Sequence, residues 1–423
     1  MKPGLNKSNT LSILNQFLYL LFFTGLIFSF RAVSSISTGL ILLTGIFFNK
    51  QQTGSFIPEN LKKPFIACCI IYFLFQFTSL FNSHNLAEDW RQIQLKTGLL
   101  FIPLAVCCCA YINSTTRRKL LAFYSILLAA AGLYCLSMAF IHYINTADST
   151  HFFYHPLVSP LKQHAVYFSL LVFVDLLFLM ETVKTREWLF NRVLHLILVS
   201  FFSLLLILLS SKLVIFFYGV YLLYYFLTLS KRIKLKKPIF VGFILFLFVG
   251  ISLLFMTSNP VSNRFKEIVQ GDLAIVQQDN YQPADYFNGL QFRLLQWKLV
   301  PEILNENKSW WTGVGAGNAQ LLLNKKYISR NMYHGKPGTD DIGYLIYNTH
   351  NQLLESLLKN GIPGAVLFLL ICFALLQIAW RNKNNIVRFT ILLLLFHAFT
   401  ESVLETQYGI LIFTFFPLFL SRD

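Results

Sequence analysis

The chain has 423 residues, of which 55% are hydrophobic and only 13% are charged, whereas a soluble domain carries about 25% charged residues. This composition excludes an ordinary soluble protein and indicates one that lies in a membrane. The net charge of +16 does not indicate nucleic-acid binding, because the basic residues are spread over alternate loops and do not gather on one soluble face.

Apolar runs recur along the chain, and each is long enough to cross about 30 Å of hydrocarbon. They predict an all-α membrane protein of about twelve transmembrane helices. The predicted spans are residues 11–30, 33–49, 64–82, 97–112, 119–146, 165–182, 188–209, 212–229, 238–256, 352–379, 386–400 and 406–421.

The basic residues predict the orientation of the chain. Twenty of the 35 basic residues fall in segments on one side of the predicted spans, with only four acids: Glu59, Glu181, Glu187 and Asp423. The segments on the other side carry equal numbers of basic and acidic residues. The positive-inside rule therefore predicts that both termini are cytoplasmic.

One outer loop, from about residue 257 to 349, is far longer than an ordinary connection and is polar and nearly neutral. It divides the chain into residues 1–256 with transmembrane helices 1–9, residues 257–349 as a periplasmic loop, and residues 350–423 with an outer helix followed by helices 10–12. Within this loop residues 284–304 predict a helix and "GVGAGNA" predicts a tight turn. The amphipathic helix that follows is expected to have Asn348 or Thr349 as its N-cap. Long loops of this kind are usually functional.

Three cations on the outer side are candidates for binding a diphosphate. Arg293 lies four residues before Trp297 on one helix face, and an arginine can bind a phosphate group bidentately; the alternative is a surface arginine packed on an indole. Arg264 follows the ninth span closely and either binds a lipid diphosphate or anchors the chain at the interface. Lys212, at the outer end of the eighth span, either binds an anion or extends its ammonium group to the interface.

His350 is the candidate base. It opens the amphipathic helix, where the positive helix end disfavours imidazolium, and a neutral imidazole can accept a proton from a sugar hydroxyl. The alternative is an ordinary loop histidine. Asp175 and Glu401 are acids inside or at the edge of spans, where they are either functional or paired with a hydroxyl or lysine. Asp340 and Asp341 are read as a solvated turn, so no metal site is expected in the loop.

Four of these residues, Lys212, Arg293, His350 and Glu401, lie in segments that resemble a known family. The run "RLLQW", "WWTGVGAGNAQ" and "YNTHNQLLESLLKNGIPGAVLF" resembles the shared region of the O-antigen ligase and O-antigen polymerase superfamily. The segment "HAFTESVLETQYGILIFTFF" is similar to the late Glu-Ser segment of that family, and "SKLVIFFYGVYLL" occupies the place of its Ser-Arg span. Lys212 departs from the family there, because lysine keeps the charge and loses the forked geometry of arginine.

The resemblance implies a GT-C-like fold in the inner membrane and a glycosyltransferase that works without a metal or another cofactor. The donor would be a glycan on undecaprenyl diphosphate, and the acceptor would be a lipid A-core sugar for a ligase or another lipid-linked repeat for a polymerase. His350 and Arg293 would be catalytic, and Arg264 and Lys212 would bind the diphosphate. Trp297, Asn351 and Glu401 would support them. Nothing in the residues separates ligase from polymerase.

A transporter or flippase for a polar or lipid-linked substrate is the alternative from another class. It predicts broken helices, intramembrane charges at mid-depth and internal repeats. The sequence shows one acid within a span, Asp175, and no repeat. The glycosyltransferase is therefore favoured.

Overall fold

The computed structural model describes residues 3–55, 63–82, 85–108, 112–185, 188, 190–233, 262–263, 266, 271–336 and 338–421. These residues form helices and no β-strand. The helices are α1 (Pro3–Ile27), α2 (Arg31–Thr53), α3 (Pro64–Phe75), η2 (Gln76–Asn82), α4 (Leu86–Lys96), α5 (Gly98–Cys108), α6 (Ser114–Thr146), η3 (Ser149–Phe152), α7 (Tyr154–Val158), η4 (Ser159–Leu161), α8 (Ala165–Thr185), α9 (Arg192–Leu208), α10 (Lys212–Ile233), η5 (Leu273–Gln277), α13 (Gly289–Glu306), α14 (Ala316–Ser329), α15 (Gln352–Arg381), α16 (Asn385–Ala398), η6 (Val403–Glu405) and α17 (Gln407–Leu420).

Seven of the described helices are long and apolar enough to cross a membrane, namely α1, α2, α3 with η2, α6, α8, α10 and α15. The shorter apolar helices α9, α16 and α17 also coincide with predicted spans, as does α5. The predicted span 238–256 lies outside the described residues. The chain is therefore an all-helical integral membrane protein, while the count of twelve spans stays a prediction.

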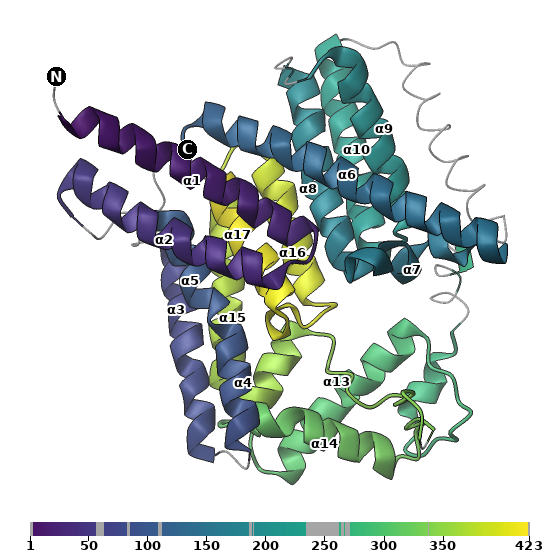
Figure 1. The fold of residues 1–423 in the computed structure, drawn as a ribbon. Coiled ribbons are helices and arrows are strands. Elements are labelled where there is room, and N and C mark those ends of the chain that lie inside the picture. Colours follow the sequence, from purple (N-terminus) through teal and green to yellow (C-terminus); the bar gives the residue numbers. More distant parts are fainter. Residues whose placement is uncertain are drawn as a thin grey trace.

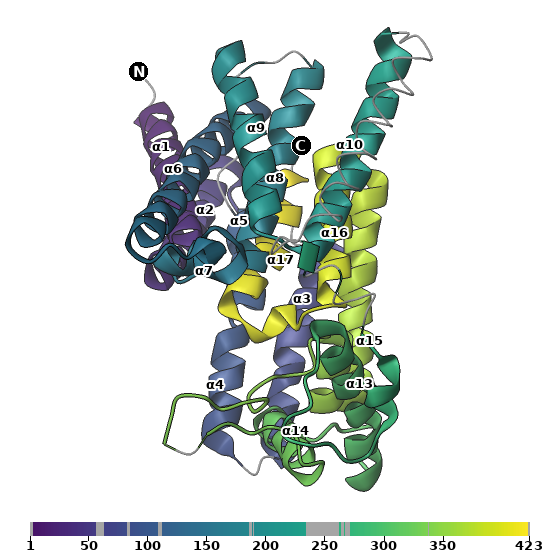
Figure 2. The same cartoon turned by 90° about the vertical axis from the view of Figure 1, so that its right-hand side faces the viewer.

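The side chains form two separate hydrophobic cores. The larger core joins α1, α2, α3, α5, α6, α8, α9, α10, α15, α16 and α17. The smaller core joins η5, α13, α14 and the loops around them with Leu358, in the first part of α15. Figures 1 and 2 show α13 and α14 below the main bundle, on the side away from the start of α1 and the end of α17. Helix α15 therefore connects the two cores.

Helices α4, α7 and α14 were not predicted from the sequence, and α4 and α14 are the longer of these. Residues 83–96 were expected to be a loop, but Leu86–Lys96 form α4, with the Asn85 side chain capping the Glu88 N–H at 3.1 Å. The segment "GVGAGNA", residues 313–319, was predicted to be a tight turn, but its last four residues are the start of α14, and Gly315 is the N-cap. Asp89 of α4 accepts a hydrogen bond from the Gly317 N–H at 2.8 Å, where the positive end of α14 favours an anion. Each helix thus stabilises the other.

Helix α15 is interrupted at Gly361, which has φ +66° and ψ −166°, a region of the backbone map that is essentially restricted to glycine. A Cβ at this position would lie 2.5 Å from the carbonyl of Trp311. The interruption places the carbonyls of Leu358 and Lys359 where they accept hydrogen bonds from Val314 and Gly315 at 2.9 and 3.0 Å. The glycine turn is thereby joined to the first part of α15.

Candidate active site

Three residues from distant segments meet beside the first part of α15. Arg293 lies on α13, His350 precedes α15, and Glu401 follows α16. The Glu401 carboxylate binds both of the others: Oε1 lies 2.6 Å from Nη2 of Arg293, and Oε2 lies 2.8 Å from Nδ1 of His350. All three side chains are partly exposed, at 31%, 23% and 18% for Arg293, His350 and Glu401. The cluster is therefore accessible to a substrate.

The Arg293 guanidinium is held on three sides. Its Nε donates to the carbonyl of Thr400 at 3.0 Å, Nη1 donates to the carbonyl of Gly289 at 3.0 Å, and Nη2 donates to Glu401. A guanidinium has five N–H donors, so these bonds with described residues leave two for a ligand. Arg293 is thus fixed in orientation and still able to contact a phosphate group.

His350 lies outside the helix that it was expected to open. The N-cap of α15 is Asn351, whose side chain accepts hydrogen bonds from Leu353 and Leu354, so the predicted caps Asn348 and Thr349 are wrong. His350 itself has a left-handed backbone with φ +45°. The Glu401 carboxylate contacts its ring. This carboxylate, and not the end of the helix, therefore determines which ring nitrogen carries the proton. Trp297 fixes this turn from α13 by donating to the carbonyl of Thr349 at 3.1 Å.

The ionisation of Glu401 determines which nitrogen of His350 can act as a base. Burial raises the pKa of Glu401, but the hydrogen bond from His350 and the charges of His350 and Arg293 lower it by more, to about 2. An ionised carboxylate only accepts hydrogen bonds, so Nδ1 of His350 must be the donor. In the neutral ring Nε2 then carries the lone pair. The cluster is therefore arranged to accept a proton at Nε2.

The lowered pKa of Glu401 predicts a pH-dependent stability. A carboxyl group whose pKa is lower in the folded state stabilises the fold above its unfolded value of 4.5, and this stabilisation is lost as the pH falls toward about 2. We expect Glu401→Gln to reduce the free energy of unfolding by about 3 kcal/mol at pH 7. This difference from wild type should stay level down to about pH 5 and shrink below pH 4.5, as measured by denaturant titration in micelles.

Glu306→Gln is the matched control, because Glu306 forms an ion pair with Lys326 and its side chain is 60% exposed. An exposed pair contributes little, so this variant should differ from wild type by less than about 1 kcal/mol at every pH. A difference for Glu401→Gln that is equally small at pH 7, or that grows on acidification, would contradict the assigned charge state.

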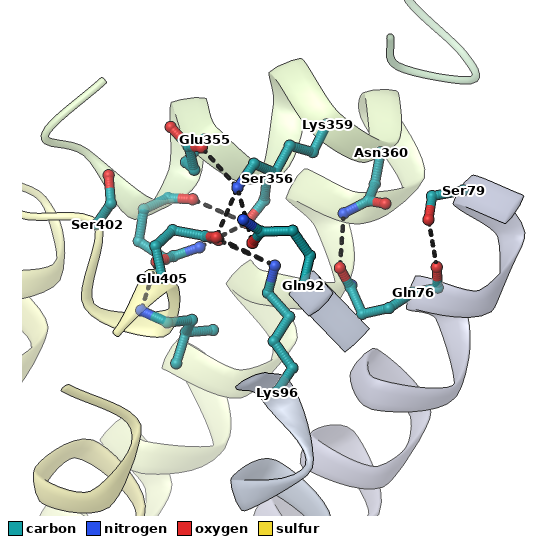
Figure 3. A network of polar contacts seen from close by, with 12 residues as sticks. Gln76, Ser79, Gln92, Lys96, Glu355, Ser356, Lys359, Asn360, Ser402 and Glu405 are labelled. Carbon is teal, nitrogen blue, oxygen red and sulfur yellow. Dashed lines mark hydrogen bonds and ion pairs between the residues drawn. The ribbon is translucent and has the colours of Figure 1, made fainter. Parts of the chain in front are cut away.

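A second, buried network lies next to this cluster and was not predicted from the sequence. Figure 3 shows Lys96 of α4 and Lys359 of α15 directed toward Glu405 of η6. Their ammonium groups lie 3.1 and 2.5 Å from the Glu405 carboxylate, and Lys359 also lies 2.9 Å from Glu355. Burial raises the pKa of Glu405, but the two ammonium groups lower it by more, so it lies well below its usual range. Two lysines and two glutamates thus form one buried ionic network with little access to solvent.

The buried network is connected to the His350 turn. Glu355 accepts hydrogen bonds from both the N–H and the hydroxyl of Thr349, at 3.2 and 2.8 Å. Thr349 directly precedes His350, so the network fixes the backbone that carries the candidate base. One signal in the sequence was available, since Glu355 and Lys359 are spaced i, i+4 on the predicted helix. Nothing local links Lys96 to Glu405, which are 309 positions apart.

The other predicted residues are placed as follows. Lys212 is the first residue of α10 and half-buried, and its role in binding a diphosphate stays a prediction. Arg264 lies outside the described residues. Asp175 is fully buried in α8 and accepts a hydrogen bond from the Ser125 hydroxyl at 2.5 Å. This is the pairing with a hydroxyl that was given above as the alternative to a functional role. Asp340 and Asp341 lie in an exposed turn, as predicted.

One group of described residues has the composition of a metal site. Ligand atoms of His142, Asp148 and His151 all lie within 4.8 Å of one another. His142 lies in α6, His151 lies in η3 and Asp148 is the N-cap of η3, and none of them belongs to the His350 cluster or to the buried network. The diphosphate site predicted here relies on side-chain cations instead.

The fold and the site together define a polytopic helical membrane protein with an accessible Arg–Glu–His cluster supported by a buried ionic network. Residues 196–369 match the family model described as O-antigen ligase, and this match supports the resemblance to the O-antigen ligase/polymerase superfamily that the motifs had indicated. The match contains Arg293 and His350 and ends before Glu401. No curated protein matches the chain.

Proposed function

We propose that the protein is a glycosyltransferase that moves a glycan from undecaprenyl diphosphate to a hydroxyl group of a lipid A-core or similar acceptor. The observation that carries the proposal is the Glu401 carboxylate, which binds the guanidinium of Arg293 and Nδ1 of His350 at the same time. The family match supports the class of reaction. The topology predicted from the sequence places the reaction in the periplasm.

The proposed reaction is a single displacement. The acceptor hydroxyl gives its proton to Nε2 of His350 while its oxygen forms a bond to the anomeric carbon. The bond from that carbon to the diphosphate breaks, and the electron pair leaves with the diphosphate. Glu401 stabilises the imidazolium that forms, and Arg293 offers N–H donors to the leaving group. Attack opposite to the leaving group inverts the anomeric carbon.

Lys212 and Arg264 complete the proposed site as further cations for the diphosphate. The diphosphate gains negative charge as its bond to the sugar breaks, so cations that are already oriented lower the barrier. Asn351 has a supporting role, because its capping bonds fix the start of α15 next to His350. The proposal needs no metal and no other cofactor.

An O-antigen or exopolysaccharide polymerase, which joins lipid-linked repeats, is the alternative with the same chemistry. Purified protein in vesicles with a polyprenyl-diphosphate-linked glycan distinguishes the two. A ligase transfers the glycan only when a lipid A-core acceptor is added, whereas a polymerase lengthens the lipid-linked glycan without it. Absence of any transfer with either acceptor would contradict the proposal, and movement of the glycan across the bilayer without an acceptor would favour a transporter.

A further inference from the structure

A groove of about 790 Å³ lies beside the buried network, and none of the predicted site residues lines it. It is formed between α2, the α4–α5 pair, η6 and the start of α17. Lys96, which separates Leu95 from Thr97 in this wall, does not line the groove, and its ammonium group binds Glu405 in the network. The lining residues include Arg31, Gly39, Arg91, Phe101, Glu405 and Leu411.

One part of the groove is polar and carries an excess of positive charge. Arg31 begins α2 and is exposed, and Arg91 of α4 binds Glu88 through two contacts of 2.6 and 2.5 Å. The Glu405 charge is already met by Lys96 and Lys359. The charge of Arg31 is therefore left in excess, and a guanidinium suits a phosphate group. By the predicted topology Arg31 lies on the outer side, where the positive-inside rule does not account for it.

The other part of the groove is apolar and borders a face of α2 that has the character of a lipid-facing surface. Phe101, Ile102 and Leu411 line it. On α2 the side chains of Ile36, Leu40 and Leu43 are 63%, 42% and 54% exposed. Large apolar side chains exposed on a membrane helix are expected to face hydrocarbon. The groove thus combines a cationic head region with an apolar tail region, as an anionic lipid requires.

The groove and the His350 cluster lie at the two ends of one connected series of contacts. Glu405 lines the groove and accepts from Lys359, which also binds Glu355. Glu355 in turn accepts from Thr349, the neighbour of His350. A lipid headgroup in the groove would therefore lie next to the segments that carry the candidate base. This arrangement suits the second substrate of a transfer reaction, whose hydroxyl must reach His350.

We infer that this groove binds the phosphate-bearing headgroup of the acceptor lipid, with its acyl chains along α2 and α5. The role as acceptor site rests on the proposed function, whereas the binding of a phosphorylated lipid rests on the groove alone. The donor diphosphate would then occupy the other side, at Arg293. Separate sites let both lipids be present when the hydroxyl attacks.

Lipid binding is measured first, with nanodiscs of phosphatidylcholine that contain a small fraction of diphosphorylated lipid A as the probe. Arg31→Gln removes the excess charge, and Gly39→Phe fills the apolar part, since a Cβ on Gly39 would meet no atom within 4 Å. We expect each variant to bind the probe about tenfold more weakly. Gly219→Phe in α10 is the matched control, because Gly219 also has open space around it, and it should bind as wild type does.

Unchanged lipid A binding by both Arg31→Gln and Gly39→Phe would overturn the inference. Transfer kinetics then test the role of the bound lipid. An acceptor site predicts that Arg31→Gln raises KM for the acceptor about tenfold with KM for the donor unchanged, and a rise in the donor KM alone would overturn the assignment. His350→Ala separates this from the proposed function, because it should bind lipid A normally, and wild-type transfer by that variant would reject the function while leaving the binding result valid.

Discussion

Replacing His350 by alanine should reduce the rate of glycan transfer by about 10²- to 10⁴-fold, the usual contribution of a general base. The reason is that Nε2 is the atom left to accept the hydroxyl proton, because Nδ1 donates to Glu401 at 2.8 Å. The rate is measured in single-turnover experiments with donor and acceptor both saturating, so that binding does not limit it. Membrane insertion and the amount of folded protein should not change, since the ring is 23% exposed and contributes little to either core.

The matched control for this experiment is His334→Ala. His334 lies in the same segment between α14 and α15, and its Nδ1 contacts only the carbonyl of Met332 among the described bonds, at 3.2 Å. This variant should transfer glycan at the wild-type rate. A rate for His350→Ala within about threefold of wild type would remove the base from the mechanism.

The variant Glu401→Gln tests the position of the proton on His350 more specifically than His350→Ala does. A glutamine amide can donate to Nδ1, which would put the proton on Nε2 and remove the lone pair that the reaction needs. We expect a loss of rate similar to that of His350→Ala. The double variant should be no slower than His350→Ala alone, since residues that act as one unit are not additive. Additive losses would mean that Glu401 acts independently of His350.

The second large effect is expected on stability, from Lys359→Met. This change removes a buried ammonium group that contacts Glu405 at 2.5 Å and Glu355 at 2.9 Å. Glu405 would keep Lys96, but Glu355, which is 2% exposed, would keep only the hydrogen bonds from Thr349. Leaving a buried charge without its partner typically costs about 3–5 kcal/mol. Denaturant titration in micelles, followed by tryptophan fluorescence, measures the loss in the free energy of unfolding.

Two further variants give this result its meaning. Asp279→Asn removes the charge of a carboxylate that pairs with Lys298 and is 81% exposed, and it should cost less than about 1 kcal/mol. Adding Glu355→Gln to Lys359→Met removes the negative charge of Glu355, which has lost its ammonium partner, and should restore part of the lost stability. If the double variant is less stable than Lys359→Met alone, the loss comes from packing and the ionic account is wrong.

Much of the helical framework could be predicted because its signals are local. Apolar runs that are long enough to span a membrane predicted the positions of α1, α2, α6, α8 and α15 within a few residues. Helices with mixed composition were missed, and α4 is the clearest case. Its sequence "LAEDWRQIQLK" is rich in charged and polar residues, as a loop usually is, and its buried residues are Asp89, Ile93 and Lys96. A helix that buries charged residues shows no apolar stripe to find.

The same distinction applies to the site. Arg293 and His350 were found because each stands in a motif that resembles a family pattern, and the family match at residues 196–369 supports this resemblance. Lys96 and Glu405 were missed because a lysine or glutamate near a loop has the appearance of a solvated residue. Only the packing of η6 between α4 and α15 excludes water from them.

The sequence by itself determined the membrane class, the approximate positions of the apolar helices and the resemblance to the superfamily, because hydrophobic length and short motifs are properties of neighbouring residues. The tertiary structure decided that Glu401 joins Arg293 to His350, that Glu405 joins Lys96 to Lys359, and that Arg31 and Arg91 share a groove. Arg293 and Glu401 are 108 positions apart. The energy of an ion pair depends on the distance between charges and on the exclusion of water, and neither is defined until the helices have packed.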